Sequence, residues 1–282
     1  MGSDPWPEAP ELPPPVIMSQ RWKDAVFLHW RIPEAVAAAF MPPGVVPDIF
    51  DDSAWVGLIG FRMEGAGLGR SPGVPYLGSF NEINVRLYSR EPDGTRGVVF
   101  LSLDASRLAV VLAARAAGIP YVWSRTRFLG ETAGVGRGSS GSPLRRTAGN
   151  AASLAAGYAV SRAAGNAASR AAGYAVSRFR DGGRSVFAIA PEAEAEATDP
   201  LSVHLTARFG LHTRFRGRTL YVPNSHSSWP LYRAKLTRLE DQLVAAAGIS
   251  VAGPPDSVLF SPGVRTLFGW PRVVDRPTDH LR

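Results

Sequence analysis

The chain has 282 residues, of which 45% are hydrophobic and 20% charged, a composition typical of a soluble globular protein that can bury a core. It contains no cysteine, which excludes disulfides, thiolate metal sites and a cysteine nucleophile. The net charge is +7, but the cations, nearly all of them arginines, are scattered along the chain, whereas nucleic-acid-binding proteins concentrate them on one face. We therefore expect no nucleic-acid partner.

The N-terminal 20 residues are acidic and proline-rich, and they lack the apolar stretch of a signal peptide. We predict a disordered leader over 1–20, with Met18 as a candidate for the natural start, and a single domain over 21–282. No apolar run approaches the ~20 residues that span a bilayer. The expected location is therefore cytoplasmic, without membrane contact.

The first half of the domain alternates strand patterns with short helical patterns. These patterns predict strands over 25–32, 55–63, 80–88, 98–104 and 121–128, a hairpin turn over 90–97, and helices over 33–44 and 106–118. The glycines of the loop 65–78 do not form a dinucleotide-binding fingerprint, because the spacing is incomplete and a strand follows where a helix is required. We therefore predict a mobile loop over 65–78.

Residues 130–179 form a Gly- and Ala-rich insertion with a 16-residue tandem duplication, 148–163 followed by 164–179. The copies differ only at Leu154/Arg170 and Ala163/Phe179. Solenoids need several longer repeats, so two short copies indicate a recent duplication of one turn and strand. We predict that the second copy occupies the sheet and that the first is extruded as a loop.

The second half begins with a hairpin around Asp181, Gly182 and Gly183 and a loop over 192–200. Further on, the patterns predict a helix over 201–211, strands over 212–217 and 219–226, a helix over 231–248, and one more strand before the tail. Many short strands with a few helices at the edges predict an α+β domain built on a large, mainly antiparallel sheet, open or closed into a barrel.

The stretch 80–88, "FNEINVRLY", is the most informative strand. Ile83, Val85 and Leu87 point to one side, and Glu82, Asn84 and Arg86 point to the other. From these residues alone, the polar face is either solvated or lines a pocket. In a closed barrel, one face of each strand is the lumen, so this face would then point inward while the apolar face packs outward against helices.

An ordered set of segments resembles a known family. The segments are "QRWKDAVFLHWRI", "MPPGVVPDIFDDSAWVGLIGFRM", "FNEINVRLY", "VVFLSLDA", "AARAAGIPY", "SVHLTARFGLH" and "HSSWPLY". Together they resemble the YqjF-like bacterial family of unknown function, in the acetoacetate-decarboxylase-like superfamily, from about Gln20 to Val274 apart from 130–165. The resemblance implies a β-barrel or cone with an internal cavity and a few peripheral helices.

The resemblance also bears on chemistry. Acetoacetate decarboxylase forms a Schiff base through a lysine whose pKa is lowered by a neighbouring cation, in the segment that resembles "AARAAGIPY". Here that segment has Arg115, which stays protonated and cannot serve as the amine. The chain's lysines, Lys23 and Lys235, lie in other segments, so Schiff-base decarboxylation is disfavoured. The resemblance places Glu82 at the position of the decarboxylase's cavity glutamate.

The candidate site follows from these observations. Glu82 is the tentative catalytic acid or base, and an arginine suits a small carboxylate. Candidate ligand-binding residues are Arg86, Asn84, His29, Arg125 and His226. A hydrogen-bonded core histidine is the favoured alternative for His29, and a loop histidine fits His226 equally well. No histidine spacing suggests a metal, no nucleophile elbow supports Ser-His-Asp catalysis, and no cofactor is expected.

Two hypotheses therefore remain open. In the first, the protein is a barrel that binds a small, anionic organic molecule in an internal cavity, with lyase- or hydrolase-like chemistry left open. In the second, it is a non-catalytic binding or interaction protein in which the same polar residues are structural. A homo-oligomer is compatible with both.

Overall fold

The computed structural model describes residues 7–69, 73, 78–108, 110–111, 118–130 and 171–274. Within these ranges the chain is mainly strand. The strands are β1 (Met18–Ile32), β2 (Val46–Pro47), β3 (Ala54–Leu68), β4 (Phe80–Arg90), β5 (Arg96–Ala105), β6 (Tyr121–Phe128), β7 (Ala172–Arg178), β8 (Arg184–Glu196), β9 (Gly210–Phe215), β10 (Arg218–His226), β11 (Tyr232–Asp241), β12 (Ser257–Phe268) and β13 (Arg272–Val273). The helices are α1 (Glu34–Ala38), α4 (Pro200–Thr206) and α5 (Leu243–Ala246).

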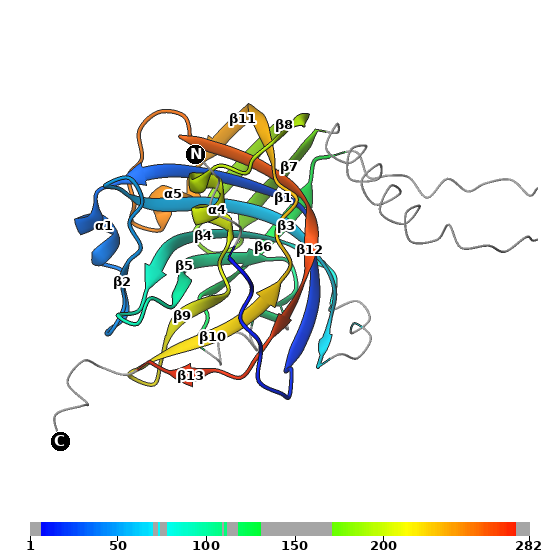
Figure 1. Cartoon of the computed structure of the whole chain (residues 1–282). Helices are drawn as coiled ribbons and strands as arrows, with labels where there is room; N and C mark the ends of the chain where they lie inside the picture. The colour runs from blue at the N-terminus through cyan, green and yellow to red at the C-terminus, as the bar shows by residue number, and fades with distance from the viewer. Residues whose placement is uncertain are drawn as a thin grey trace, which may run out of the picture.

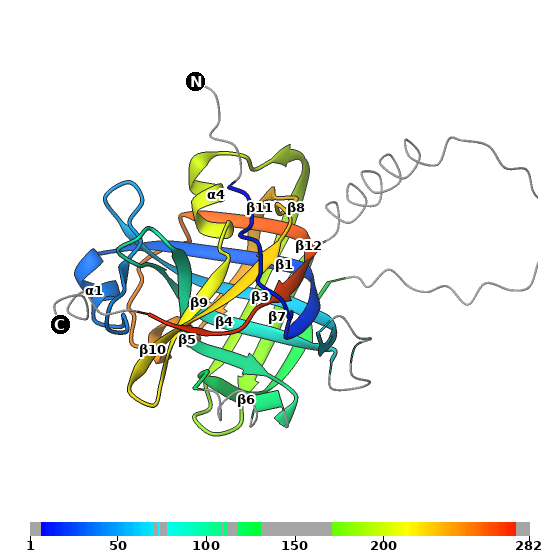
Figure 2. The ribbon, with the colours of Figure 1, turned by 60° about the horizontal axis from the view of Figure 1, so that its bottom comes forward.

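The strands belong to one large sheet whose pairing is ring-like (Figures 1 and 2). Pairing runs through β5, β6, β7, β8, β11, β12, β1, β3 and β4, and β4 pairs again with β5. A second path leads from β5 through β9 and β10 to β12. Most of these pairs are antiparallel, while β5 pairs parallel with both β6 and β9.

Most predicted strands are present, and several are longer than their patterns indicate. β1 begins at Met18, inside the predicted leader, and β3 continues to Leu68, inside the predicted loop 65–78. The hairpin between β4 and β5 is confirmed, with the amide of Glu91 donating to the carbonyl of Thr95. The short helix after Pro33 is also present, as α1.

The prediction of a helix over 231–248 is wrong, because the first part of this segment is the strand β11. The pairing of β11 with β8 shifts register between Leu236 and Arg238, which marks a β-bulge. The extra residue places Leu236 and Leu239 on the half-buried side three residues apart, which imitates helical spacing. Only the short α5 is helical in this segment.

Two further boundaries differ from prediction. Residues 192–196, predicted as loop, continue β8. The predicted helix over 201–211 ends at Thr206, since β9 begins at Gly210. Asp199 caps α4 by accepting a hydrogen bond from the amide of Ser202 at 3.0 Å.

The duplicated segment contributes one strand to the described part of the chain. β7 comes from the second copy, as expected, and pairs with β6 on one side and β8 on the other. The first copy and the central part of the predicted helix over 106–118 lie outside the described residues.

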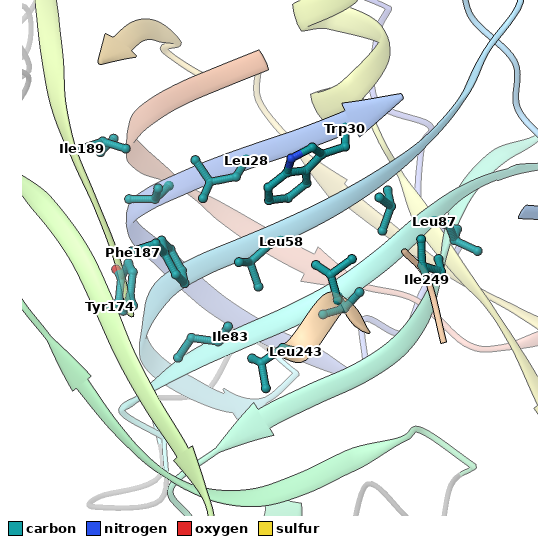
Figure 3. Close-up of a cluster of buried hydrophobic side chains, with 14 of the residues drawn as sticks. Leu28, Trp30, Leu58, Ile83, Leu87, Tyr174, Phe187, Ile189, Leu243 and Ile249 are labelled. Carbon is teal, nitrogen blue, oxygen red and sulfur yellow. The ribbon is translucent and has the colours of Figure 1, made fainter. Parts of the chain in front are cut away.

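The apolar side of β4 belongs to the main core (Figure 3). Ile83 and Leu87 share this core with Leu58 of the neighbouring strand β3 and with Leu28 and Trp30 of β1, and all are buried. The opposite wall of this core comes from β7, β8, α5 and the segment after it, through Tyr174, Phe187, Ile189, Leu243 and Ile249. The apolar face of β4 is thus covered mainly by other strands, and less by helices than predicted.

In the described part of the chain, no helix has the length and apolar character needed to cross a membrane.

Candidate functional site

A cavity of about 520 Å³ lies on the other side of β4. Four alternate residues of this strand line it: Phe80, Glu82, Asn84 and Arg86. Much of the remaining wall is apolar and comes from Trp22, Phe27, Ile59, Phe61, Met63, Phe100, Leu103, Ile119, Trp229 and Phe268. The alternating side chains of β4 therefore separate the apolar core from a cavity that contains a row of polar residues.

Glu82 is the buried carboxyl group of this row, with 3% of its surface exposed. Tyr121 Oη donates a hydrogen bond of 2.5 Å to Glu82 Oε2, and Asn84 Nδ2 donates one of 3.4 Å to Glu82 Oε1. Burial raises the pKa of Glu82 to about 7, against the opposing effect of these hydrogen bonds. A carboxyl group with this pKa can take up or release a proton near neutral pH.

Asn84 stands beside Glu82 with an unsatisfied oxygen. Its side chain is 1% exposed, and Asn84 Oδ1 has no hydrogen-bond partner among the residues that the structure describes. A flip of the amide would turn Oδ1 toward Glu82, where it could accept from the protonated carboxyl. The pair is thus compatible with both protonation states of Glu82.

Arg86 is the last residue of the polar row and lies at its end beside Tyr88. Arg86 Nε donates to Tyr88 Oη at 3.2 Å, and one terminal nitrogen donates to the carbonyl of Leu205 at 3.3 Å. Its guanidinium carbon lies 5.4 Å from the ring centroid of Tyr88 and 5.8 Å from that of Phe27. No carboxylate of the described residues lies within 4 Å of Arg86.

A second arginine, Arg208, reaches the cavity from the segment between α4 and β9. It is 4% exposed and forms an ion pair with Asp48. Its guanidinium carbon lies 4.9 Å from the centroid of the Tyr88 ring, and in the described part of the chain Arg208 Nη2 has no hydrogen-bond partner. Burial lowers the pKa of Arg208 to about 10, so it stays charged at neutral pH.

The two candidate histidines have different positions. His226 lines the cavity, and its ring nitrogens lie 2.8 Å from the carbonyl of Ser227 and 3.3 Å from that of Arg208. His29 is fully buried outside the cavity lining, with Nε2 2.6 Å from Tyr88 Oη, which fits the core-histidine alternative. Burial lowers the pKa of both rings.

The structure does not bring Arg125 to the cavity, because this residue is exposed on β6. Both lysines also lie away from it. Lys23 forms an ion pair with Glu64 at 2.9 Å, and Lys235 forms one with Glu192 at 3.0 Å. Neither lysine is among the residues that line the cavity.

Sequence reasoning missed Tyr121 and Arg208. Tyr121 reaches Glu82 because β5 pairs with β4 on one side and with β6 on the other. A parallel pair such as β5 and β6 leaves no short-range turn signal, so the contact is invisible in the sequence. Arg208 was hidden within the predicted helix over 201–211, which actually ends at Thr206.

No group of three or more His, Asp or Glu side chains suited to a metal ion occurs within the described ranges. The polar side chains that line the cavity are one carboxyl group, one phenol, the three amides of Gln20, Asn84 and Asn224, the hydroxyl of Thr206, two guanidinium groups, a histidine ring and the indoles of Trp22 and Trp229. These groups can bind an anion and exchange a proton.

Comparison with solved structures finds similar folds. An acetoacetate decarboxylase-like enzyme from Sphingomonas wittichii RW1 superposes with a TM-score of 0.60 at 11% identity, over 93% of this chain and 94% of that one. Acetoacetate decarboxylase from Legionella pneumophila gives 0.59 at 11% identity, over 97% and 93%. The enduracididine biosynthesis enzyme MppR complexed with pyruvate gives 0.54 at 16% identity, over 93% and 91%. At these identities the likeness concerns the fold.

Comparison with sequences leads to a family. The uncharacterized protein YqjF of Bacillus subtilis (strain 168) is 25% identical over 256 residues, which cover 90% of this chain and 91% of that protein. The model of the DUF2071 family, described as an uncharacterized conserved protein, matches residues 19–265. The chain therefore belongs to the DUF2071 family and has an acetoacetate-decarboxylase-like fold.

Proposed function

We propose that this protein binds a small, anionic organic molecule in the cavity beside β4, within a barrel- or cone-like wall of strands. The observation that carries the proposal is Arg86, a guanidinium group that lines the cavity without a carboxylate partner among the described residues. A carboxylate ligand would supply the missing counter-ion through charge-assisted hydrogen bonds. Pockets of about 300–1,000 Å³ with an apolar wall and a few polar groups are typical small-molecule sites.

Glu82 is proposed as the group that exchanges a proton with the ligand. Its pKa of about 7 leaves both protonation states populated at neutral pH. Schiff-base chemistry is not part of the proposal, because neither lysine of the chain lines the cavity. Incubation with acetoacetate and borohydride is expected to leave the protein unmodified, and an adduct at Lys23 or Lys235 would contradict this.

The binding proposal is tested by titration calorimetry with small carboxylates and keto acids. We expect the wild type to bind at least one of them and Arg86→Gln to bind it at least tenfold more weakly, since a charged hydrogen bond contributes about 1.5–3 kcal/mol. Arg125→Gln removes the same charge from an exposed position and should bind like the wild type.

The competing function is purely structural, with the polar row serving only to brace the sheet. The bond between Tyr121 and Glu82 is the observation that favours it. If no carboxylate binds the wild type while Glu82→Gln and Arg86→Gln both unfold at lower temperature, the structural role is correct.

A further inference from the structure

The cavity is long in the direction of β4. Its lining includes Phe80, Glu82, Asn84 and Arg86, which span six residue steps of one strand. At a rise of about 3.3 Å per residue, this row extends over roughly 20 Å. A ligand that fills the cavity must therefore be extended as well.

The two ends of the row differ in charge. At the Arg86 end, Arg86 and Arg208 both lie close to the ring of Tyr88. Asp48, the carboxylate partner of Arg208, also pairs with Arg96. Glu82 is four residues from Arg86, about 13 Å along the strand. This end therefore carries positive charge without matching negative charge from the described residues.

The Phe80 end has a largely apolar wall with one amide, that of Gln20, and leads to the surface. Met63, Ala66 and Leu68 of β3 line it, and Leu68 is 77% exposed. An outer pocket of about 780 Å³ shares Gln20, Met63 and Phe80 with the cavity. We infer that a ligand enters at the Phe80 end and reaches Arg86 with its leading group.

The volume argues against a short keto acid as the natural occupant. At about 30 Å³ per water molecule, 520 Å³ has room for about 17 waters. A four-carbon keto acid has about seven non-hydrogen atoms and would leave more than half of this space to water against aromatic walls, which is unfavourable.

The geometry points to a monocarboxylate with an extended apolar body, such as a medium-chain fatty acid. Its carboxylate binds at Arg86, with Arg208 beside it, and its apolar body follows β4 toward Phe80. This inference rests on the proposed function and narrows it to one ligand class. It concerns the binding part of that function: the anion lies at Arg86 and Glu82 faces the body of the ligand, so proton exchange with Glu82 requires a ligand that carries an acidic or basic group about 13 Å from its carboxylate.

The first test is a homologous series of straight-chain acids, from acetate through butanoate and octanoate to dodecanoate, titrated below their micelle concentrations. Burial of one methylene contributes about 0.8 kcal/mol, so Kd should fall about fourfold for each added methylene until the cavity is full. Equal Kd values along the series would overturn the inference while leaving the proposed function intact. Absence of binding by every acid would overturn both.

The second test locates the carboxylate. Arg86→Gln should weaken octanoate binding at least tenfold and leave 1-octanol binding unchanged, because the alcohol carries no charge. Arg86→Lys keeps the charge and should restore part of the octanoate affinity, and Arg125→Gln should behave as the wild type. Equal losses for octanoate and 1-octanol in Arg86→Gln would show that the head group does not lie at Arg86.

The third test locates the apolar body. Ala66→Leu adds three carbon atoms to the wall near the Phe80 end. The chain length at which affinity stops rising should become shorter, while affinity for butanoate stays that of the wild type. An unchanged cutoff would show that the chain lies elsewhere.

Discussion

Two arginines of this protein have opposite surroundings. Arg178 of β7 donates to both carboxylate oxygens of Asp104 at 2.8 Å and to Ser102 at 2.9 Å, and its side chain is 5% exposed. Arg86 lines a cavity and donates only to a hydroxyl and a backbone carbonyl among the described residues. The comparison separates a guanidinium group that is paired with a carboxylate of the same chain from one that has no carboxylate partner among the described residues.

Removal of Asp104 should have the largest effect on stability. Asp104→Ala leaves Arg178 buried without its main counter-ion, which typically costs about 3–5 kcal/mol of unfolding free energy. Urea denaturation monitored by tryptophan fluorescence measures this change. Asp104→Leu combined with Arg178→Met is the control, because replacing both charges by apolar groups should recover most of the loss. Equal instability of the single and double variants would show that packing, and not charge, holds this region together.

The next largest expected effect is the contribution of Glu82 to the pH dependence of the free energy of unfolding. The folded-state pKa of about 7 exceeds the ordinary value of 4.5, so the folded protein binds this proton more tightly than the unfolded chain. The resulting stabilisation is complete below pH 4.5 and is lost as the pH rises through 7. Between pH 5 and pH 8 the loss from this one group is about 2–3 kcal/mol.

Glu82→Gln isolates this contribution. Buried histidines with lowered pKa values, among them His29, His204 and His226, give the opposite slope, because their folded forms lose the proton more readily. Subtracting the stability curve of the variant from that of the wild type cancels these groups. The variant should be comparatively more stable at pH 8 than at pH 5, and parallel curves would contradict the raised pKa.

The sequence alone predicted the part of the candidate site that lies on a single strand, β4. Alternation alone placed Ile83 and Glu82 on opposite sides of β4, because side-chain direction in a strand is local. The contact of Tyr121 with Glu82 joins residues 39 positions apart and depends on the parallel pairing of β5 and β6. Nothing local in the chain encodes that register.

The errors in the fold have the same origin. The helix predicted over 231–248 failed because the bulge at Leu236 and Arg238 is specified by pairing with β8. The pairing of Arg178 with Asp104, 74 positions away, was equally hidden. Local patterns identified most strands. Which charged side chains form ion pairs depends on the pairing between strands, which those patterns do not contain.

Arg86→Gln should have a smaller effect on stability than Asp104→Ala. It removes ring contacts with Tyr88 and Phe27 and two hydrogen bonds, to Tyr88 Oη and to the carbonyl of Leu205, a change of about 1–2 kcal/mol for a half-buried group without an ion pair among the described residues. Urea denaturation of the ligand-free protein gives the value. A loss near that of Asp104→Ala would mean that Arg86 is as structural as Arg178, and the contrast between them would disappear.

The duplication allows two deletion variants to be compared, because both copies contain an arginine at the position that Arg178 occupies in β7. Deletion of 148–163 keeps Arg178, whereas deletion of 164–179 brings Arg162 to the same place beside the turn at Asp181. The two products differ only at the Leu154/Arg170 and Ala163/Phe179 positions, so each should fold with the buried ion pair intact. Phe179 lies 4.4 Å from Trp123 between ring centroids, and losing this exposed pair should lower the stability of the second product by about 0.5 kcal/mol. Loss of soluble protein in both deletions would show that the sheet needs both copies.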